Sequence, residues 1–577
     1  MKNLFTQTIL AAAVMLSVAA PFASADVYIG DKKCTNLGDA FGKVRDGETI
    51  TVSGSEDCTW TINPVANVNI TIQGENNATI NIKRRAIDNT FRVFCNLNQD
   101  GSGVTIKDLT IAQVETDETG KATAFSGNLI QQQYGKLYME NVIVKGFATT
   151  APNGAIRIYG KAVSSGLKNV AFEDCTIPNN YNVFCAKGGY SVNIGGKCNY
   201  TVRLHDKTSS LTADNIAEGS NIDLSLASSM TGNDVVKGTE DFEMFSVATS
   251  GSNYILGPNN GNLTALANKN VLLIKTVDGV TTSSTQDAFP GNNALAANTR
   301  IILYGDVNYT SSVKMDGNTI EIAGGKEGVT LTRTVDRYIA NTGAADTHIT
   351  IKNLTLSQSL ASSENALVRA YNGTSSVVLQ NVTFKNITSS KDAMIIQTGS
   401  QLTLDGVTFD NCQTQADALV TVPAPGNVTL SGLNEGLSIA PTFNIKNVTP
   451  INCEGIQKPE NLITVVISED FINSIPVDTD DESKKCPVIF TNFNHTDPYD
   501  YFTISNTNYT LDYTDGGKNL ILITKTASGV EEIEGEEAAD VAPVYYDVNG
   551  VMVPSDALTP GLYICVKGDQ ASKVVIR

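Results

Sequence analysis

The sequence predicts an all-β protein with two tandem parallel β-helix domains and a small C-terminal β domain. Three observations lead to this prediction. First, a motif of two short alternating strands around one Asn, Asp or Gly recurs along the chain. Second, the whole series of motifs is present twice, in the same order. Third, tight turns separate the strands at the C-terminal end. With 41% hydrophobic and 18% charged residues, the chain can form a folded core.

Residues 1–25 have the features of a secretory signal peptide. Lys2 supplies a positive start, residues 9–16 are apolar, and Ala-Ser-Ala at 23–25 is a small-residue cleavage site. The alternative, a membrane anchor, needs about 20 apolar residues, and this run is shorter and ends at Pro21. We therefore expect an exported protein with no transmembrane segment in the mature chain.

The mature chain starts with a segment suited to cover one end of the fold. Residues 34–44 have the pattern of a short amphipathic helix, and the turn Asp46-Gly47 follows them. The first coil of a β-helix has unpaired strand edges, which such a helix can cover.

The recurring motif reads apolar, any, apolar, polar, then Asn, Asp or Gly, then apolar, any, apolar, as in residues 104–111. Asn, Asp and Gly tolerate left-handed backbone angles, so one such residue turns the chain while both flanking strands keep their register. Stacked coils of this kind form a parallel β-helix. The alternative, an antiparallel sandwich, needs two-residue hairpins that are scarce here. The turn residues are Asp108, Asn141, Asn169, Asn353, Asn381, Gly406 and Asn447.

A larger duplication covers these motifs. The tripeptide Asp-Ala-Phe at 39–41 recurs at 287–289, which is 248 residues later. Further matches follow in the same order, with offsets that drift because loops differ in length. The sequence thus predicts two copies, at residues 26–270 and 271–526.

The coil pattern over residues 35–450 resembles that of the right-handed parallel β-helix proteins, the pectate-lyase-like group. The resemblance implies right-handed coils. That group contains polysaccharide lyases, glycoside hydrolases and non-catalytic surface proteins, so the fold alone does not select a reaction.

The C-terminal region has a linker and a compact β pattern. Residues 527–543 are acidic and read as a solvated spacer. In residues 544–577, a hairpin turn at Asn549-Gly550 is followed by a Pro-Gly-x-Tyr-Ile strand and a basic-apolar end strand. This tail resembles the C-terminal sorting domain of type IX secretion substrates. The resemblance implies a β-sandwich-like sorting domain, a secretion machinery as partner, and the outer surface of a Gram-negative bacterium. An ordinary small β cap is the alternative.

The ten cysteines fit an oxidising compartment. No CxxC pair occurs, which argues against a thiol-redox or structural zinc site. Local disulfides are expected between Cys34 and Cys58 and between Cys185 and Cys198. Buried free thiols are the alternative.

Charge and composition restrict the ligand. The net charge of −19 argues against nucleic acid as a partner, and three His residues make a metal site hard to build, so no cofactor is expected. The sequence has no Gly-His-Gly and no dense Asp cluster on successive coils, so no catalytic residue is assigned. Basic residues at similar places in both copies could hold an acidic glycan, or they could simply pair with surface acids. These residues are Lys83, Arg84, Arg85, Arg92, Arg333 and Arg337.

The preferred interpretation is a secreted, adhesin-like surface protein that binds a polysaccharide or a host-surface glycan without catalysis. A lyase or hydrolase acting on acidic (uronate) polysaccharide is the alternative. A structural surface-layer component is the second alternative.

Overall fold

In the computed structural model the chain forms two compact units, one up to Thr332 and the other from Arg333 onward. None of the helices in the described ranges is long and apolar enough to cross a membrane. The structure describes residues 25–83, 93–114, 123–247, 253–291, 295, 298–311, 315, 317–443, 448–474, 487–506, 508–513, 518–524, 543–547, 550–567 and 570–576.

The first unit starts with two short strands and the expected helix, α2 (Leu37–Lys43). The Asn36 side chain caps α2 by accepting a hydrogen bond from the backbone N–H of Asp39 at 2.8 Å. Leu37 and Ala40 are buried where α2 packs against its neighbouring strands, so the prediction of a short amphipathic helix is confirmed. These strands are β1 (Asp26–Ile29), β2 (Lys32–Cys34) and β3 (Thr49–Cys58).

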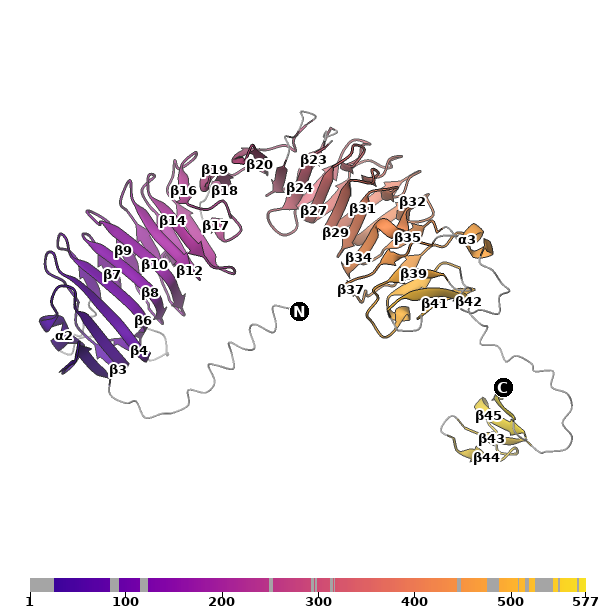
Figure 1. The fold of residues 1–577 in the computed structure, drawn as a ribbon, viewed down its shortest axis with the longest axis horizontal. Helices are drawn as coiled ribbons and strands as arrows, with labels where there is room; N and C mark the ends of the chain where they lie inside the picture. Colours follow the sequence, from indigo (N-terminus) through magenta and orange to yellow (C-terminus); the bar gives the residue numbers. More distant parts are fainter. Residues whose placement is uncertain are drawn as a thin grey trace. The chain divides into compact units, whose positions relative to one another are not determined.

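Long parallel strands follow β3 and lie side by side in the order of the sequence (Figure 1). Alternate residues of each strand point into the core, and the parallel register aligns them from one strand to the next. The strands are β4 (Asn69–Ile82), β6 (Gly103–Gln113), β8 (Lys136–Lys145), β10 (Ser164–Glu173), β12 (Ser191–Gly196), β14 (Ser210–Ile216) and β16 (Asp234–Lys237). One aligned column is Ile50, Ile72, Ile106, Met139, Leu167 and Ile194, each at most 1% exposed.

A second run of parallel strands alternates with the first along the chain. Its inward residues Ile130, Ile156 and Val183 are fully buried. The strands are β5 (Cys95–Leu97), β7 (Ile130–Gln132), β9 (Ile156–Ile158), β11 (Val183–Cys185), β13 (Asn199–Leu204), β15 (Asn221–Leu226) and β17 (Phe245–Val247).

Antiparallel strands end this sheet, because β18 (Tyr254–Asn259) and β19 (Asn262–Ala267) form a hairpin that pairs with β16. The next sheet begins with a second hairpin. Its strands within the first unit are β20 (Val271–Val277), β21 (Val280–Gln286), β22 (Thr299–Leu303), β23 (Val307–Tyr309), β24 (Thr319–Gly324) and β25 (Thr330–Arg333), the last of which ends at the unit boundary. The copies at 26–270 and 271–526 remain a prediction.

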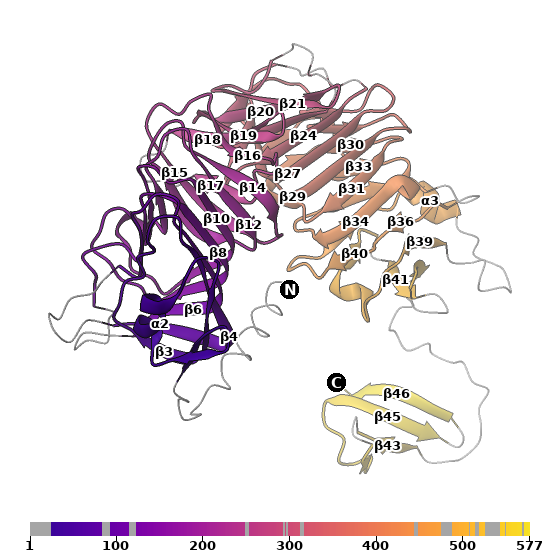
Figure 2. The same cartoon turned by 60° about the vertical axis from the view of Figure 1, so that its left-hand side comes forward.

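The second unit repeats this arrangement of two parallel runs (Figure 2). Its longer run contains β27 (His348–Gln358), β29 (Ser376–Ser389), β31 (Gln401–Asp405), β32 (Thr408–Thr414), β34 (Val428–Leu433), β36 (Ile451–Asn452), β37 (Ile456–Gln457) and β39 (Val488–Thr491). The shorter run contains β26 (Ala340–Asn341), β28 (Val368–Ala370), β30 (Ile395–Gln397), β33 (Val420–Val422), β35 (Ser438–Pro441), β38 (Ile463–Val465) and β40 (Phe502–Ile504). Helix α3 (Glu469–Ser474) lies between β38 and β39 in the chain, and the antiparallel strands β41 (Tyr509–Tyr513) and β42 (Leu520–Thr524) follow β40.

The predicted turn residues adopt the left-handed conformation. The φ angles are 57° at Asp108, 54° at Asn141 and 51° at Asn169, and the equivalent turn residues of the second unit, Asn353, Asn381 and Gly406, also have positive φ. The Asn141 side-chain amide donates to Asp108 Oδ1 at 2.8 Å, and that of Asn169 donates to Asn141 Oδ1 at 2.8 Å. The prediction for these six residues is confirmed, and Asn447 lies outside the described residues.

The C-terminal segment forms a separate antiparallel sheet with the strand order β44-β43-β45-β46. Gly550, at φ 78°, lies in the hairpin turn that the sequence predicts. The described residues form one sheet, so the second layer of a sandwich is not among them. The strands are β43 (Val544–Tyr546), β44 (Met552–Val553), β45 (Gly561–Lys567) and β46 (Gln570–Ile576).

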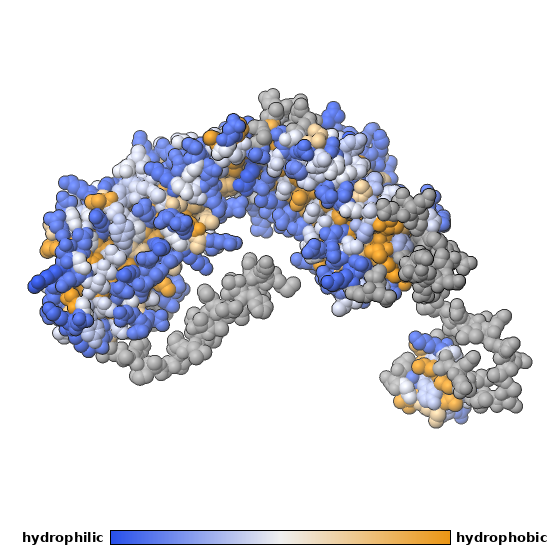
Figure 3. Space-filling view, in the orientation of Figure 1, coloured by the Kyte–Doolittle hydropathy of each residue, from blue (hydrophilic) through white to orange (hydrophobic). Residues whose placement is uncertain are grey.

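The fold is thus nearly all β, with long parallel sheets that are compatible with a β-helix. The visible surface of both units is largely hydrophilic with scattered apolar residues (Figure 3). Function must therefore be sought in local groups of side chains.

Candidate ligand-binding site

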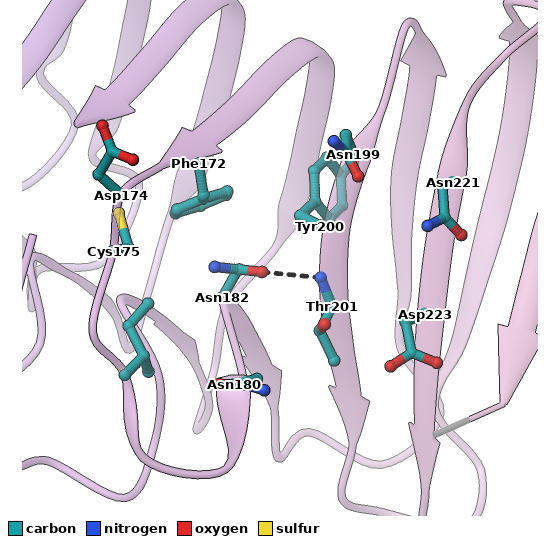
Figure 4. A pocket seen from close by; sticks show the side chains of 11 residues that line it. Phe172, Asp174, Cys175, Asn180, Asn182, Asn199, Tyr200, Thr201, Asn221 and Asp223 are labelled. Carbon is teal, nitrogen blue, oxygen red and sulfur yellow. Dashed lines mark hydrogen bonds between the residues drawn. The ribbon is translucent and has the colours of Figure 1, made fainter. Parts of the chain in front are cut away.

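The first unit has a hollow of about 360 Å³ on its surface (Figure 4). It lies where β10, β13 and β15 meet the short 3₁₀ helix η1 (Pro178–Asn180) and the loop before β11. Its polar lining consists of Asp174, Asn180, Asn182, Asn199, Thr201, Asn221 and Asp223. Its less polar lining consists of Phe172, Cys175, Ile177 and Tyr200.

The parallel register of β13 and β15 produces the polar wall. Asn199 lies beside Asn221, and Thr201 lies beside Asp223. Because side chains alternate along a strand, Tyr200 between Asn199 and Thr201 points into the core and is only 4% exposed. Two adjacent strands therefore present polar groups outward in matched positions.

Some polar groups of the hollow are used by the protein, and others are open. Asn182 Oδ1 accepts a hydrogen bond from the Thr201 backbone N–H at 2.8 Å (Figure 4). Asp223 Oδ1 accepts one from Ser246 Oγ at 3.0 Å. The side-chain amides of Asn180, Asn199 and Asn221 form no hydrogen bond with any other described residue. Each of these three amides can donate to and accept from a ligand.

The floor of the hollow is aromatic and uncharged. The rings of Phe172 and Tyr200 meet edge to face, with centroids 6.0 Å apart. Tyr200 donates its hydroxyl to Cys198 Sγ at 3.4 Å, and burial raises the pKa of Tyr200 well above its usual value. Burial also raises the pKa of the Cys175 thiol to about 11. Neither group is an anion near neutral pH, so neither serves as a ready base or nucleophile.

A stripe of one arginine and three rings lies next to the hollow, on β11 and β13 and beside their ends. Arg203, two residues after Thr201, donates to Ser225 Oγ at 3.0 Å and lies 5.8 Å from the Tyr181 ring centroid. Phe184 stacks on His205 with centroids 5.2 Å apart. This stripe extends the surface along which a long ligand could lie.

The carboxylates of Asp174 and Asp223 both line the hollow, and paired carboxylates are the groups that glycosidases use. Within the ranges that the structure covers, no group of three His, Cys, Asp or Glu side chains could hold a metal ion.

Of the basic residues proposed from the sequence, those that the structure describes do not line this hollow. Lys83 forms an ion pair with Asp57 at 2.5 Å. Arg84, Arg85 and Arg92 lie outside the described residues.

In the second unit, Arg333 has no exposed surface. Its Nη1 donates to the Asn365 carbonyl at 2.9 Å, and its Nη2 donates to Gln358 Oε1 at 2.6 Å. Arg333 therefore stabilises the interior of this unit and presents no group to a ligand. Arg337 is exposed.

The four cysteines expected in disulfides are free thiols in the structure. Cys58 donates to the Trp60 carbonyl at 3.4 Å, and Cys198 donates to the Gly195 carbonyl at 3.3 Å. The pairings of Cys34 with Cys58 and of Cys185 with Cys198 stay predictions for the exported protein, which non-reducing peptide mapping can check.

Sequence reasoning did not identify the hollow. Its residues come from five separate segments, and none belongs to a recognised catalytic motif. One feature of the sequence indicates the polar wall of the hollow. Residues 199–204 and 221–226 both alternate polar and apolar residues, and their polar residues are at equivalent positions.

Comparison with protein families, curated proteins and solved structures finds no match to this chain.

Proposed function

We propose that this chain is a secreted surface protein that binds a glycan in the hollow of the first unit without catalysing a reaction. The observation that supports this proposal is the set of open amides of Asn180, Asn199 and Asn221 together with the half-buried ring of Phe172 in the same hollow. Amides donate to and accept from sugar hydroxyls, and aromatic side chains pack against the apolar face of a sugar ring.

The fold that best fits this proposal is a pair of right-handed parallel β-helix copies. Neighbouring strands of a sheet lie about 4.8 Å apart. The matched pairs of β13 and β15 therefore offer polar groups at a short regular interval, which favours an extended polysaccharide over a compact ligand.

The proposed localisation of the protein is based on the sequences of its N-terminal and C-terminal segments. Residues 1–25 support export, and residues 544–577 support recognition by a type IX secretion machinery and display on the outer surface of a Gram-negative bacterium. Deleting residues 544–577 tests this, because normal surface display of the truncated chain would contradict it.

A polysaccharide hydrolase or lyase is the second candidate, since Asp174 and Asp223 line the same hollow. It differs from a binding protein in one measurable way. New reducing ends, or an absorbance rise from unsaturated products on uronate polysaccharides, would replace the binding proposal by the enzymatic one.

A glycan array with the full chain tests binding, followed by titration of the glycans that bind. The test variant carries Asn199→Ala and Asn221→Ala. Each lost hydrogen bond contributes about 1 kcal/mol, so binding should weaken about 30-fold. The control is Asn193→Ala, which removes an exposed strand amide on β12 outside the hollow. Equal affinity of the double variant and the control would refute the proposed site.

A further inference from the structure

The second unit has an arginine held between two tyrosine rings. Arg369 lies on β28, and its guanidinium carbon is 4.4 Å from the ring centroid of Tyr371 and 5.7 Å from that of Tyr338. Tyr371 is 48% exposed, so one side of this arrangement is open to solvent. Stacking on aromatic rings orients the planar guanidinium and leaves its N–H edge available.

Arg369 has no acidic partner among the described residues, although acids outnumber bases in the chain by 60 to 41. Its side chain forms neither a hydrogen bond nor an ion pair with any residue that the structure describes. Some surface cations of the same unit are paired, for example Lys385 with Asp410 at 2.9 Å and Lys458 with Asp500 at 2.8 Å. A cation fixed by rings and left unpaired in an acidic protein is suited to an anionic ligand.

The neighbouring strand adds an acceptor that lacks a donor. Asn341 on β26 is the register partner of Arg369. Its Oδ1 is buried and has no hydrogen-bond partner among the described residues. A buried acceptor without a donor is costly, and a ligand hydroxyl beside the arginine would supply the missing donor with a small adjustment of the side chain.

The first unit contains a similar arrangement with one ring. Arg157 lies on β9, and its guanidinium carbon is 4.3 Å from the ring centroid of Tyr159. The spacing of arginine and tyrosine is two residues, as for Arg369 and Tyr371. Arg157 Nε is likewise buried without a partner in the described structure. An arginine next to a tyrosine ring two residues later thus occurs in the described part of each unit.

We propose that Arg369 with Tyr338 and Tyr371, and Arg157 with Tyr159, are two sites that bind the carboxylate of an acidic sugar. The guanidinium donates two parallel hydrogen bonds to the carboxylate, and the exposed tyrosine contacts the sugar ring. A free hydroxyl of the sugar ring explains the choice of a sugar acid over an acidic peptide side chain, because this hydroxyl can donate a hydrogen bond to Asn341 Oδ1. These sites are separate from the hollow and do not require it to bind a ligand.

Calorimetric titration of the full chain with a galacturonate hexamer tests the proposal. The titration is made in the Asn199→Ala/Asn221→Ala background, so that the hollow does not contribute. We expect two sites per chain, one site after Arg369→Gln, and none after Arg369→Gln with Arg157→Gln. Arg369→Lys keeps the charge but loses the planar fork, and it should weaken that site about tenfold.

Two controls keep the outcome clear. Lys391→Gln removes one exposed positive charge from the same unit and should leave both sites unchanged. A neutral galactose hexamer should not bind. Unchanged stoichiometry and affinity in Arg369→Gln, equal binding of the neutral hexamer, absence of binding to the galacturonate hexamer, or binding of sulfated oligosaccharides alone would each overturn the proposal. Circular dichroism of each variant verifies that it is folded.

Discussion

Replacing Asn141 should destabilise the first unit by an amount that can be worked out from its turn. Asn141 has a φ of 54°, donates to Asp108 at 2.8 Å and accepts from Asn169 at 2.8 Å. Alanine at a left-handed position costs about 1 kcal/mol more than asparagine, and the two exposed hydrogen bonds contribute about 0.5–1 kcal/mol each. We expect a loss of about 2–3 kcal/mol for Asn141→Ala. Asn141→Gly relieves the backbone strain and should lose only about 1–2 kcal/mol.

The single tryptophan provides the assay. Trp60 belongs to the first unit and packs over Gly38 of α2, since a Cβ at Gly38 would lie 2.4 Å from the Trp60 ring. Urea unfolding followed by Trp60 fluorescence therefore reports on this unit. Asn381→Ala is the matched control, because it changes the equivalent turn of the second unit and should leave the Trp60 transition in place.

Comparing Asn141→Ala with Asn141→Gly separates the contribution of backbone strain from that of the side-chain hydrogen bonds. If Asn141→Gly destabilised the unit as much as Asn141→Ala, backbone strain would have no part in selecting asparagine. If neither variant shifted the transition, the ladder of turn side chains would not contribute to stability.

Two further predictions concern the second unit. Arg333→Met should lower its free energy of unfolding by about 3–5 kcal/mol, measured by circular dichroism in urea, because it leaves the buried acceptors of Arg333 unpaired; a loss below 1 kcal/mol would refute this. For Asp336, burial alone would raise the pKa, but hydrogen bonds from the backbone N–H groups of Glu364 and Asn365 outweigh it and lower the pKa. The ionised carboxylate therefore stabilises the unit above about pH 4, and this stabilisation is lost as the pH falls through the lowered pKa. The difference in unfolding midpoint between wild type and Asp336→Asn should therefore shrink at low pH.

The turns could be predicted from the sequence because their geometry admits few residue types. Asn141 and Asn353 occupy left-handed positions where most side chains are strained, so the residue type itself carries the structural information. The hairpin at Gly550 follows from the same restriction. Charge gives no such information. Arg333 reads like a surface cation in the sequence, yet the tertiary fold surrounds it with carbonyl oxygens from residues about thirty positions away.

The hollow could not be predicted for a related reason. Asn180, Asn199 and Asn221 are ordinary polar residues in three separate segments, and only the register of the strands places them together. A β-sandwich-like arrangement is expected for the C-terminal segment, and its described residues support one sheet of such a sandwich.

The direction of the backbone hydrogen bonds has a mechanical consequence. In parallel strands these bonds point from each strand to its neighbour, so within a unit they run along the direction in which the strands are stacked. A pull along that direction loads the last strand first and leaves the others bonded. Each unit should therefore yield to tension gradually, from its ends inward, and reform one strand pair at a time when the load is removed.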